Sequence, residues 1–193
     1  MSEADIIQLV KTDAWMMKIL KSVEVLNLND WWIGAGFLRS KVWDNLHGFK
    51  SQTELPDVDV IYFNKNDFSK EDENKFSINA EEKYQKLLKE ELPGIKWSVT
   101  NQARMHIFHR TKPYENSEDA LSDWSETATC IGIRLIKEKL ILTAPYGIKD
   151  LVNLKLRKIP DYDFKFRHDP DLFFNRIKKK KWLEKWPKLK VVV

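Results

Sequence analysis

Residues 31–60, WWIGAGFLRSKVWDNLHGFKSQTELPDVDV, constrain the fold of this chain more than any other segment. A short apolar run, which we expect to be a buried strand, leads into Gly34 and Gly36. Apolar residues then keep helical spacing as far as Gly48, a typical helix end. After a polar loop, Asp57-Val58-Asp59-Val60 alternates acidic and apolar residues. That alternation predicts a strand with one acidic and one apolar face.

This order of elements predicts a site for a phosphorylated ligand and a metal ion. A glycine turn at a helix N-terminus offers backbone N–H groups and the positive end of the helix dipole to an anion. Asp57 and Asp59 point the same way, and their oxygens suit Mg²⁺ carried with nucleotide phosphates. The alternatives are a solvent-facing acidic edge strand and a plain strand-to-helix turn. Neither a P-loop nor a dinucleotide-binding glycine motif is present in the sequence.

Composition limits the classes of protein that remain. A hydrophobic fraction of 42% with 8 Trp is enough for a core and excludes wholesale disorder. The length favours a single domain over residues 1–193, with a core of about 1–150 and a C-terminal extension over 151–193. A net charge of +4 is compatible with nucleotide or RNA binding without requiring either. The single Cys130, and the lack of a signal peptide or a bilayer-spanning apolar run, predict a cytoplasmic protein without membrane association.

Hydrophobic spacing elsewhere predicts the remaining elements. We expect a helix over 3–26, a strand over 58–63, a helix over 80–92, a strand from residue 97 that turns helical near residue 102, an antiparallel pair over 128–136 and 140–144, and a basic helix over 171–186. Helices and strands alternate early, and strands cluster late. This order favours an α+β or α/β fold, a mixed β-sheet flanked by helices.

Two polar segments allow two interpretations each. Asn101, Gln102, Arg104 and His106 could read a base or hold a phosphate, with Arg104 binding it bidentately. They could equally be a strand end satisfied by hydrogen bonds. The basic stretch 176–190 interleaves lysines with two tryptophans, a composition that can bind RNA. We favour a helix docked through Ile177, Leu183 and Trp186, with its lysines solvated.

The segment 31–60 resembles the signature of the nucleotidyltransferase superfamily with the DNA polymerase β-like palm. Ala35-Gly36-Phe37-Leu38-Arg39, followed by Asp57-Val58-Asp59-Val60, is similar to the head domain of CCA-adding enzymes and bacterial poly(A) polymerases. Their pattern is Gly-Gly-Ala-Val-Arg-Asp, a helix, and Asp-hydrophobic-Asp-hydrophobic. Most of the chain also resembles a family of bacterial nucleotidyltransferase-like proteins of unassigned substrate, which share stretches like 42–44, 57–63, 101–106 and 144–147.

The resemblance implies a palm-like mixed sheet and a Mg²⁺-dependent transfer of a nucleoside monophosphate from an NTP to an acceptor, with release of pyrophosphate. Asp57 and Asp59 would hold Mg²⁺, Gly34 and Gly36 would abut the triphosphate, and Arg39 would contact a phosphate. The acceptor could be an RNA or a small molecule. CCA addition itself is not expected, because the arginine-rich base-recognition motifs of those enzymes are not evident downstream.

Catalysis in this superfamily usually needs a third carboxylate on a neighbouring strand, as the general base toward the acceptor hydroxyl. The strand from residue 97 offers Thr100 and Asn101 at the natural place, and an asparagine cannot abstract a proton. Glu126 and Asp150 are the candidate replacements. If neither reaches the site, the chain would be a nucleotide- or RNA-binding module without catalysis. In a third reading the aspartates are surface charge on a structural partner protein.

Overall fold

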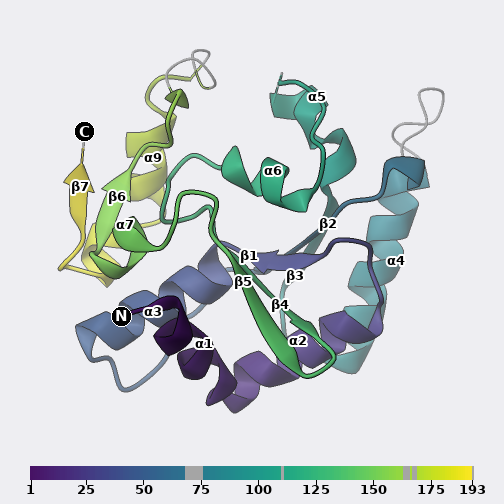
Figure 1. Ribbon diagram of the computed structural model, residues 1–193, viewed down its shortest axis with the longest axis horizontal. Helices are drawn as coiled ribbons and strands as arrows, with labels where there is room; N and C mark the ends of the chain where they lie inside the picture. Colours follow the sequence, from purple (N-terminus) through teal and green to yellow (C-terminus); the bar gives the residue numbers. More distant parts are fainter. Residues whose placement is uncertain (68–75, 110, 163–165, 167–168, 193) are drawn as a thin grey trace.

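The computed structural model describes residues 1–67, 76–109, 111–162, 166 and 169–192 (Figure 1). Its helices are α1 (Glu3–Lys11), α2 (Ala14–Val25), α3 (Gly36–His47), α4 (Phe76–Glu91), α5 (Met105–His109), α6 (Ser117–Ser122), α7 (Lys149–Val152), α9 (Leu172–Lys179) and α10 (Trp182–Lys185), with 3-10 turns η1 (Lys65–Asp67) and η2 (Gln102–Arg104). Its strands are β1 (Trp32–Gly34), β2 (Val58–Tyr62), β3 (Trp97–Asn101), β4 (Gly132–Ile136), β5 (Lys139–Thr143), β6 (Lys155–Arg157) and β7 (Lys190–Val192). Among these helices none is long and apolar enough to cross a membrane.

A five-stranded mixed sheet forms the centre of the molecule. Its strand order is β3-β2-β1-β4-β5, with β2 and β3 parallel and the other neighbours antiparallel. The parallel register places Asp59 opposite Ser98. A second, two-stranded sheet pairs β6 with β7 in parallel. The predicted mixed sheet flanked by helices, with the fold of a nucleotidyltransferase head domain, is confirmed.

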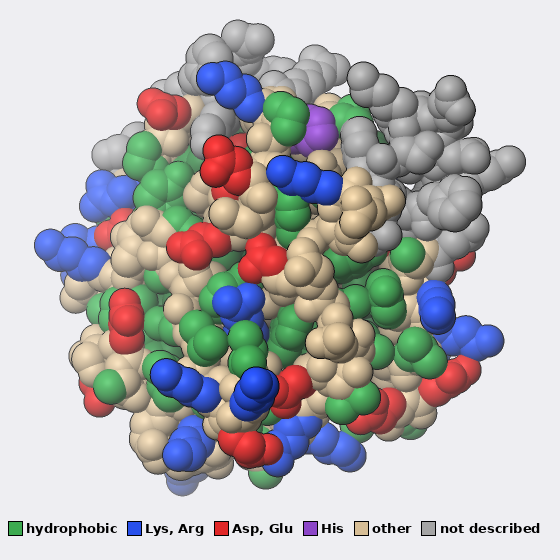
Figure 2. Space-filling model, turned by 45° about the vertical axis from the view of Figure 1, so that its right-hand side comes forward, with side chains coloured by type: hydrophobic (Ala, Val, Ile, Leu, Met, Phe, Trp, Pro, Cys, Tyr) green, Lys and Arg blue, Asp and Glu red, His purple; other side chains and the backbone are tan. Residues whose placement is uncertain are grey.

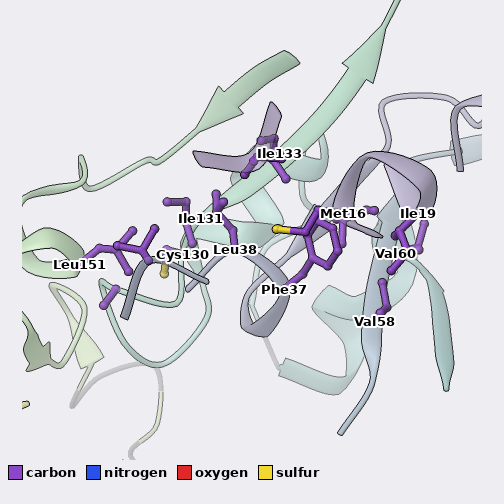
Figure 3. Close-up of a cluster of buried hydrophobic side chains, with 14 of the residues drawn as sticks. Met16, Ile19, Phe37, Leu38, Val58, Val60, Cys130, Ile131, Ile133 and Leu151 are labelled. Atoms are coloured by element: carbon purple, nitrogen blue, oxygen red, sulfur yellow. The ribbon is translucent and has the colours of Figure 1, made fainter. Parts of the chain in front are cut away.

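The two faces of the sheet have different neighbours. In the view of Figure 1, α1 and α2 lie below the sheet, α3 lies to its left, α4 runs along its right side, and α5 and α6 lie above it. Val58 and Val60 belong to the large buried core together with Phe37 and Ile133, all labelled in Figure 3. Ile61 packs on the other face, against Leu121 of α6. Strand alternation therefore turns Asp59 toward the face that carries α5 and α6.

Two helices predicted as continuous are each interrupted. The predicted helix 3–26 is α1 followed by α2, because Asp13 accepts a hydrogen bond at 3.0 Å from the N–H of Met16 and caps a new helix. The predicted basic helix 171–186 is α9 followed by α10, separated at Lys181, where φ is 53°. The apolar spacing continues across both interruptions, so spacing alone could not locate them.

The C-terminal segment packs onto the main core. Phe173, Ile177, Trp182 and Trp186 are buried in the same cluster as the lower face of the sheet. This confirms the docked-helix interpretation of the basic stretch. Leu183, which we assigned to the buried face, is 43% exposed instead, because the interruption at Lys181 turns α10 relative to α9.

Candidate functional site

A cavity of about 540 Å³ opens on the α5–α6 side of the sheet. Several parts of the chain line it, and they include the loop before β2 and β2 itself (Glu54, Asp57, Asp59), the first turns of α3 (Ala35, Gly36, Arg39, Ser40), β3 and its continuation (Ser98, Thr100, Gln102), the region of α5 and α6 (Met105, His109, Asp123, Trp124), the segment before β4 (Thr129), and the C-terminal helices with the residues before them (Asp169, Arg176, Lys180, Trp182, Lys185). The predicted acidic strand and the predicted phosphate-binding turn thus open onto one space.

Asp57 and Asp59 line this cavity together, and Glu54, Asp123 and Asp169 are also part of its lining. Burial and the neighbouring charge of Asp57 raise the pKa of Asp59, and the Ser98 hydroxyl and the charges of Lys180 and Arg39 offset only part of that rise. Two like charges in a partly buried site repel, and a cation between them relieves the repulsion. The donor set therefore fits a divalent cation with hard-ligand preference. In the described part of the chain no group of three His, Cys, Asp or Glu side chains could hold a metal, so the remaining ligands would come from phosphate oxygens and water.

The turn before α3 differs from the expected glycine cradle. The residue with positive φ is Ala35, at φ 44° and ψ −112°, and no side chain caps the helix there. A Cβ on Gly34 would lie 2.7 Å from Cη2 of Trp124, so glycine at this position lets the indole pack closely. Gly36 lines the cavity and has ordinary room around it. The open first turn of α3 is thus at Gly36, with Gly34 behind it.

Arg39 supplies a fixed positive charge to the cavity wall. Its guanidinium donates to Oγ1 of Thr129 at 3.0 Å and lies over the rings of Trp43 and Trp182, at 5.1 and 4.5 Å from their centroids. Burial lowers the pKa of Arg39 to about 10, and the charge of Glu126 opposes that shift. The group is therefore protonated at neutral pH and held in place by two aromatic faces.

Glu126 and Asp150 are engaged away from the aspartate pair. Glu126 is fully buried, and its Oε1 accepts from Nε of Arg176 at 2.9 Å and from Oγ of Ser125 at 2.8 Å. Its Oε2 has no hydrogen-bond partner among the described residues. Asp150 accepts from Nε of Arg157 at 3.0 Å and from the hydroxyl of Thr127. The described lining of the cavity includes neither carboxylate.

Asn101 and Arg104 serve the end of β3. The Asn101 carboxamide accepts from the N–H groups of Asn64 and Ala103, both at 3.1 Å, and donates to the Asn64 carbonyl at 3.0 Å. Arg104 pairs with Glu81, whose carboxylate also accepts from the Asn101 N–H. These contacts favour the interpretation of a strand end satisfied by hydrogen bonds. The β3 side chains that reach the cavity are those of the opposite parity, Ser98 and Thr100.

Sequence reasoning missed a hydrogen-bonded chain at the α5–α6 end of the cavity. The Tyr114 hydroxyl donates to Oδ2 of Asp123 at 3.0 Å and lies 2.9 Å from Nδ1 of His109. A tyrosine hydroxyl has one proton, so Nδ1 of His109 is the donor toward Tyr114. Burial lowers the pKa of His109, which keeps the ring neutral at pH 7. No spacing in the sequence links these residues, which come from α5, a loop and the end of α6.

The cations of α9 and α10 were also missed. Arg176 and Lys180 are four residues apart and share one side of the helical turn, a signal that the sequence does contain. We expected the lysines of this stretch to be the solvated face of a docked helix, whereas Lys180 and Lys185 line the cavity. On the face of the molecule in Figure 2, acidic, basic and hydrophobic side chains are interspersed rather than segregated.

Comparisons with known proteins agree with this geometry. A family model described as nucleotidyltransferase matches residues 21–191. A solved structure reported to reveal a CCA-adding enzyme head domain is 32% identical, with a TM-score of 0.80, over 99% of this chain and 96% of that one. A search of curated proteins gave no match.

Two solved structures of CCA-adding enzymes share the fold at lower identity. One was solved with CTP (15% identity, TM-score 0.57, 100% of this chain and 44% of that one). The other is the Thermotoga maritima enzyme in complex with a tRNA (16% identity, TM-score 0.57, 96% of this chain and 42% of that one). This chain therefore spans less than half the length of either enzyme. The family match and the shared head-domain fold show that the chain belongs to the nucleotidyltransferase family.

Proposed function

We propose that the protein is a Mg²⁺-dependent nucleotidyltransferase that moves a nucleoside monophosphate from an NTP to an acceptor and releases pyrophosphate. One observation carries the proposal. Asp57 and Asp59, on a strand, and Arg39 with the uncapped first turn of α3 line the same cavity. Its volume of about 540 Å³ is within the usual range for small-molecule sites. Structural neighbours solved with CTP and with tRNA support a nucleotide as the donor and leave RNA or a small molecule open as the acceptor.

Each residue has a role that its surroundings support. Asp57 and Asp59 would hold Mg²⁺, which would neutralise phosphate charge and polarise the reacting phosphoryl group. The Ser98 hydroxyl, opposite Asp59 in the register of β2 and β3, favours the ionised form of that carboxyl. The N–H groups at the start of α3, beside Gly36, would bind phosphate oxygens, and Arg39 would add a fixed positive charge.

A second candidate function is nucleotide binding without transfer. It is favoured by Ser98 and Thr100, which present hydroxyl groups to the cavity from the strand where a third carboxylate would be expected. Glu126, the residue we nominated for that role, is held by Arg176. The two functions share the metal and the nucleotide, and they differ only in whether pyrophosphate is released.

The test is calorimetric titration of each NTP, with and without Mg²⁺, into the wild type and into a variant carrying Asp57→Asn and Asp59→Asn. A Glu82→Gln variant, changed on the exposed side of α4, controls for the loss of an acidic charge. Mg²⁺-dependent binding to the wild type and the control, lost in the double variant, supports the site. Absence of binding to the wild type would overturn it. Pyrophosphate release on adding candidate acceptors then separates transfer from binding.

A further inference from the structure

Helix α9 divides its residues among three surroundings. Phe173 and Ile177, four residues apart, are buried in the main core. Lys178 and Lys179 are exposed to solvent. Arg176 and Lys180, again four residues apart, line the cavity beside the aspartates. The docking of the apolar side therefore fixes which of the basic side chains face the cavity.

Contacts hold this basic side in place. Arg176 donates from Nε to the fully buried carboxylate of Glu126 at 2.9 Å, and its guanidinium lies 6.0 Å from the ring centroid of Trp182. Lys180 lies close enough to Asp59 to lower the pKa of that carboxyl. Lys185 of α10 lines the same cavity. Arg176, Lys180 and Lys185 are called the basic wall below.

The cavity holds charges of both signs. Asp57 and Asp59 line it at the start of β2, Arg176, Lys180 and Lys185 line it from the C-terminal helices, and Glu54, Asp123 and Asp169 line it as well. A metal–polyphosphate complex has the complementary arrangement, with its cation on one side and its phosphate oxygens on the other. Charge-assisted hydrogen bonds from arginine and lysine are strong and suit phosphate oxygens.

We propose that the basic wall binds the polyphosphate chain of the nucleotide, so that the C-terminal helices complete the donor site that the sheet and α3 begin. This inference rests on the proposed function and adds to it the group that Arg176, Lys180 and Lys185 recognise. The alternative partner is the backbone of a nucleic acid. The position of the wall within a cavity of about 540 Å³, next to Asp59, favours the compact polyphosphate of one nucleotide.

The experiment uses inorganic tripolyphosphate as the probe, titrated by calorimetry with and without Mg²⁺. Lys180→Gln is the main variant, because no hydrogen bond or ion pair joins the Lys180 side chain to a buried group in the part of the chain that the structure describes. Lys179→Gln, an exposed lysine on the same helix, is the matched control. We expect tripolyphosphate affinity to fall about tenfold in Lys180→Gln and by less than about twofold in Lys179→Gln.

Several outcomes would overturn the inference. Equal effects of Lys180→Gln and Lys179→Gln on tripolyphosphate binding would do so. Dependence on Lys180 for binding a single-stranded oligonucleotide, but not tripolyphosphate, would do so as well. If NTPs bind with dependence on Asp57 and Asp59 but not on Lys180, the basic wall fails and the proposed function stands. If tripolyphosphate binds through Lys180 while no NTP binds, the wall stands and the proposed function fails.

Discussion

Ser98 on β3 lies directly opposite Asp59 of β2 in the parallel register, and its hydroxyl lowers the pKa of that carboxyl. A short polar side chain thus occupies the neighbouring-strand position at which an additional acid would be expected. It favours the ionised form of one proposed metal ligand. The acidic centre consists of two carboxylates supported by a hydroxyl.

Replacing Ser98 with alanine should weaken metal binding. The carboxylate of Asp59 would lose the neighbouring hydroxyl that favours its charged form, and polar partners of metal ligands typically contribute about tenfold or more to metal affinity. We therefore expect Mg²⁺ affinity in the presence of an NTP to fall about tenfold. Calorimetry measures it, with exposed Ser51→Ala as the control. An unchanged affinity in Ser98→Ala would show that the hydroxyl does not support the metal site.

Replacing Asp59 with asparagine should stabilise the metal-free protein. Burial and Asp57 raise the pKa of Asp59, so the folded state binds more protons than the unfolded state above pH 3.8. As pH rises from 3.8 through the raised folded pKa, the contribution of this group to the free energy of unfolding falls. At pH 7 the ionised carboxylate therefore destabilises the folded state. We expect Asp59→Asn to raise the free energy of unfolding by about 0.5–2 kcal/mol at pH 7, measured by urea denaturation.

The same comparison at low pH is its control. The advantage of Asp59→Asn should disappear below pH 3.8, where the carboxyl is protonated in both states. A variant that is less stable than the wild type at pH 7 would contradict the assignment of a repulsive, desolvated pair.

Replacing Ala35 with glycine should relieve backbone strain. The left-handed φ of 44° at ψ −112° costs a residue with a Cβ about 1–3 kcal/mol, and glycine adopts it freely. Part of that gain is offset by the greater freedom of glycine in the unfolded chain. We expect a net stabilisation of about 1 kcal/mol by thermal or urea denaturation. Ala80→Gly, within α4, should instead destabilise by a similar amount. Destabilisation at both positions would show that Ala35 is unstrained.

Neutralising Glu126 should be strongly destabilising. Glu126→Gln removes the carboxylate that pairs with the guanidinium of Arg176 and whose charge favours the protonated form of buried Arg39. We expect the free energy of unfolding to fall by about 3–5 kcal/mol. Adding Arg176→Gln should recover part of it, because the unpaired charge is then removed. Urea denaturation of the two single variants and the double variant measures the coupling. Additive losses would mean that the two side chains do not act as a pair.

His109 should make stability fall on acidification. Burial lowers its pKa, so the unfolded state, with a pKa of 6.5, binds more protons in the window below that value. The contribution of the neutral ring is complete above pH 6.5 and is lost as pH falls through the folded pKa. His109→Asn, whose amide can still donate toward Tyr114, should flatten the dependence of unfolding free energy between pH 7.5 and 5.5. An identical pH profile in the variant would contradict this.

Local patterns predicted the strand and helix that carry the site. The alternation at Asp57–Val60 and the apolar spacing up to Gly48 depend only on neighbouring residues, and the structure places both as expected. The mixed sheet also followed from the order of elements. These features are local, so they can be read from one segment at a time.

What the sequence could not predict depends on contacts between distant segments. Position 34 has no room for a Cβ, because the ring of Trp124, 90 positions further along the chain, packs against it. The sequence offers Glu126 as a candidate third carboxylate. In the structure Glu126 pairs instead with Arg176 of α9, and the sequence does not show where that helix packs. Lys180 looks like part of a solvated run until the buried side of α9 is known.

Paramagnetic NMR with Mn²⁺ in place of Mg²⁺ tests the central claim most directly, because it locates the metal without requiring an acceptor. In the presence of an NTP, we expect Mn²⁺ to broaden the amide signals of residues 34–39 and 57–60, and the Asp57→Asn, Asp59→Asn variant to abolish the effect. Broadening elsewhere, or unchanged broadening in the variant, would contradict a metal–nucleotide site at these aspartates.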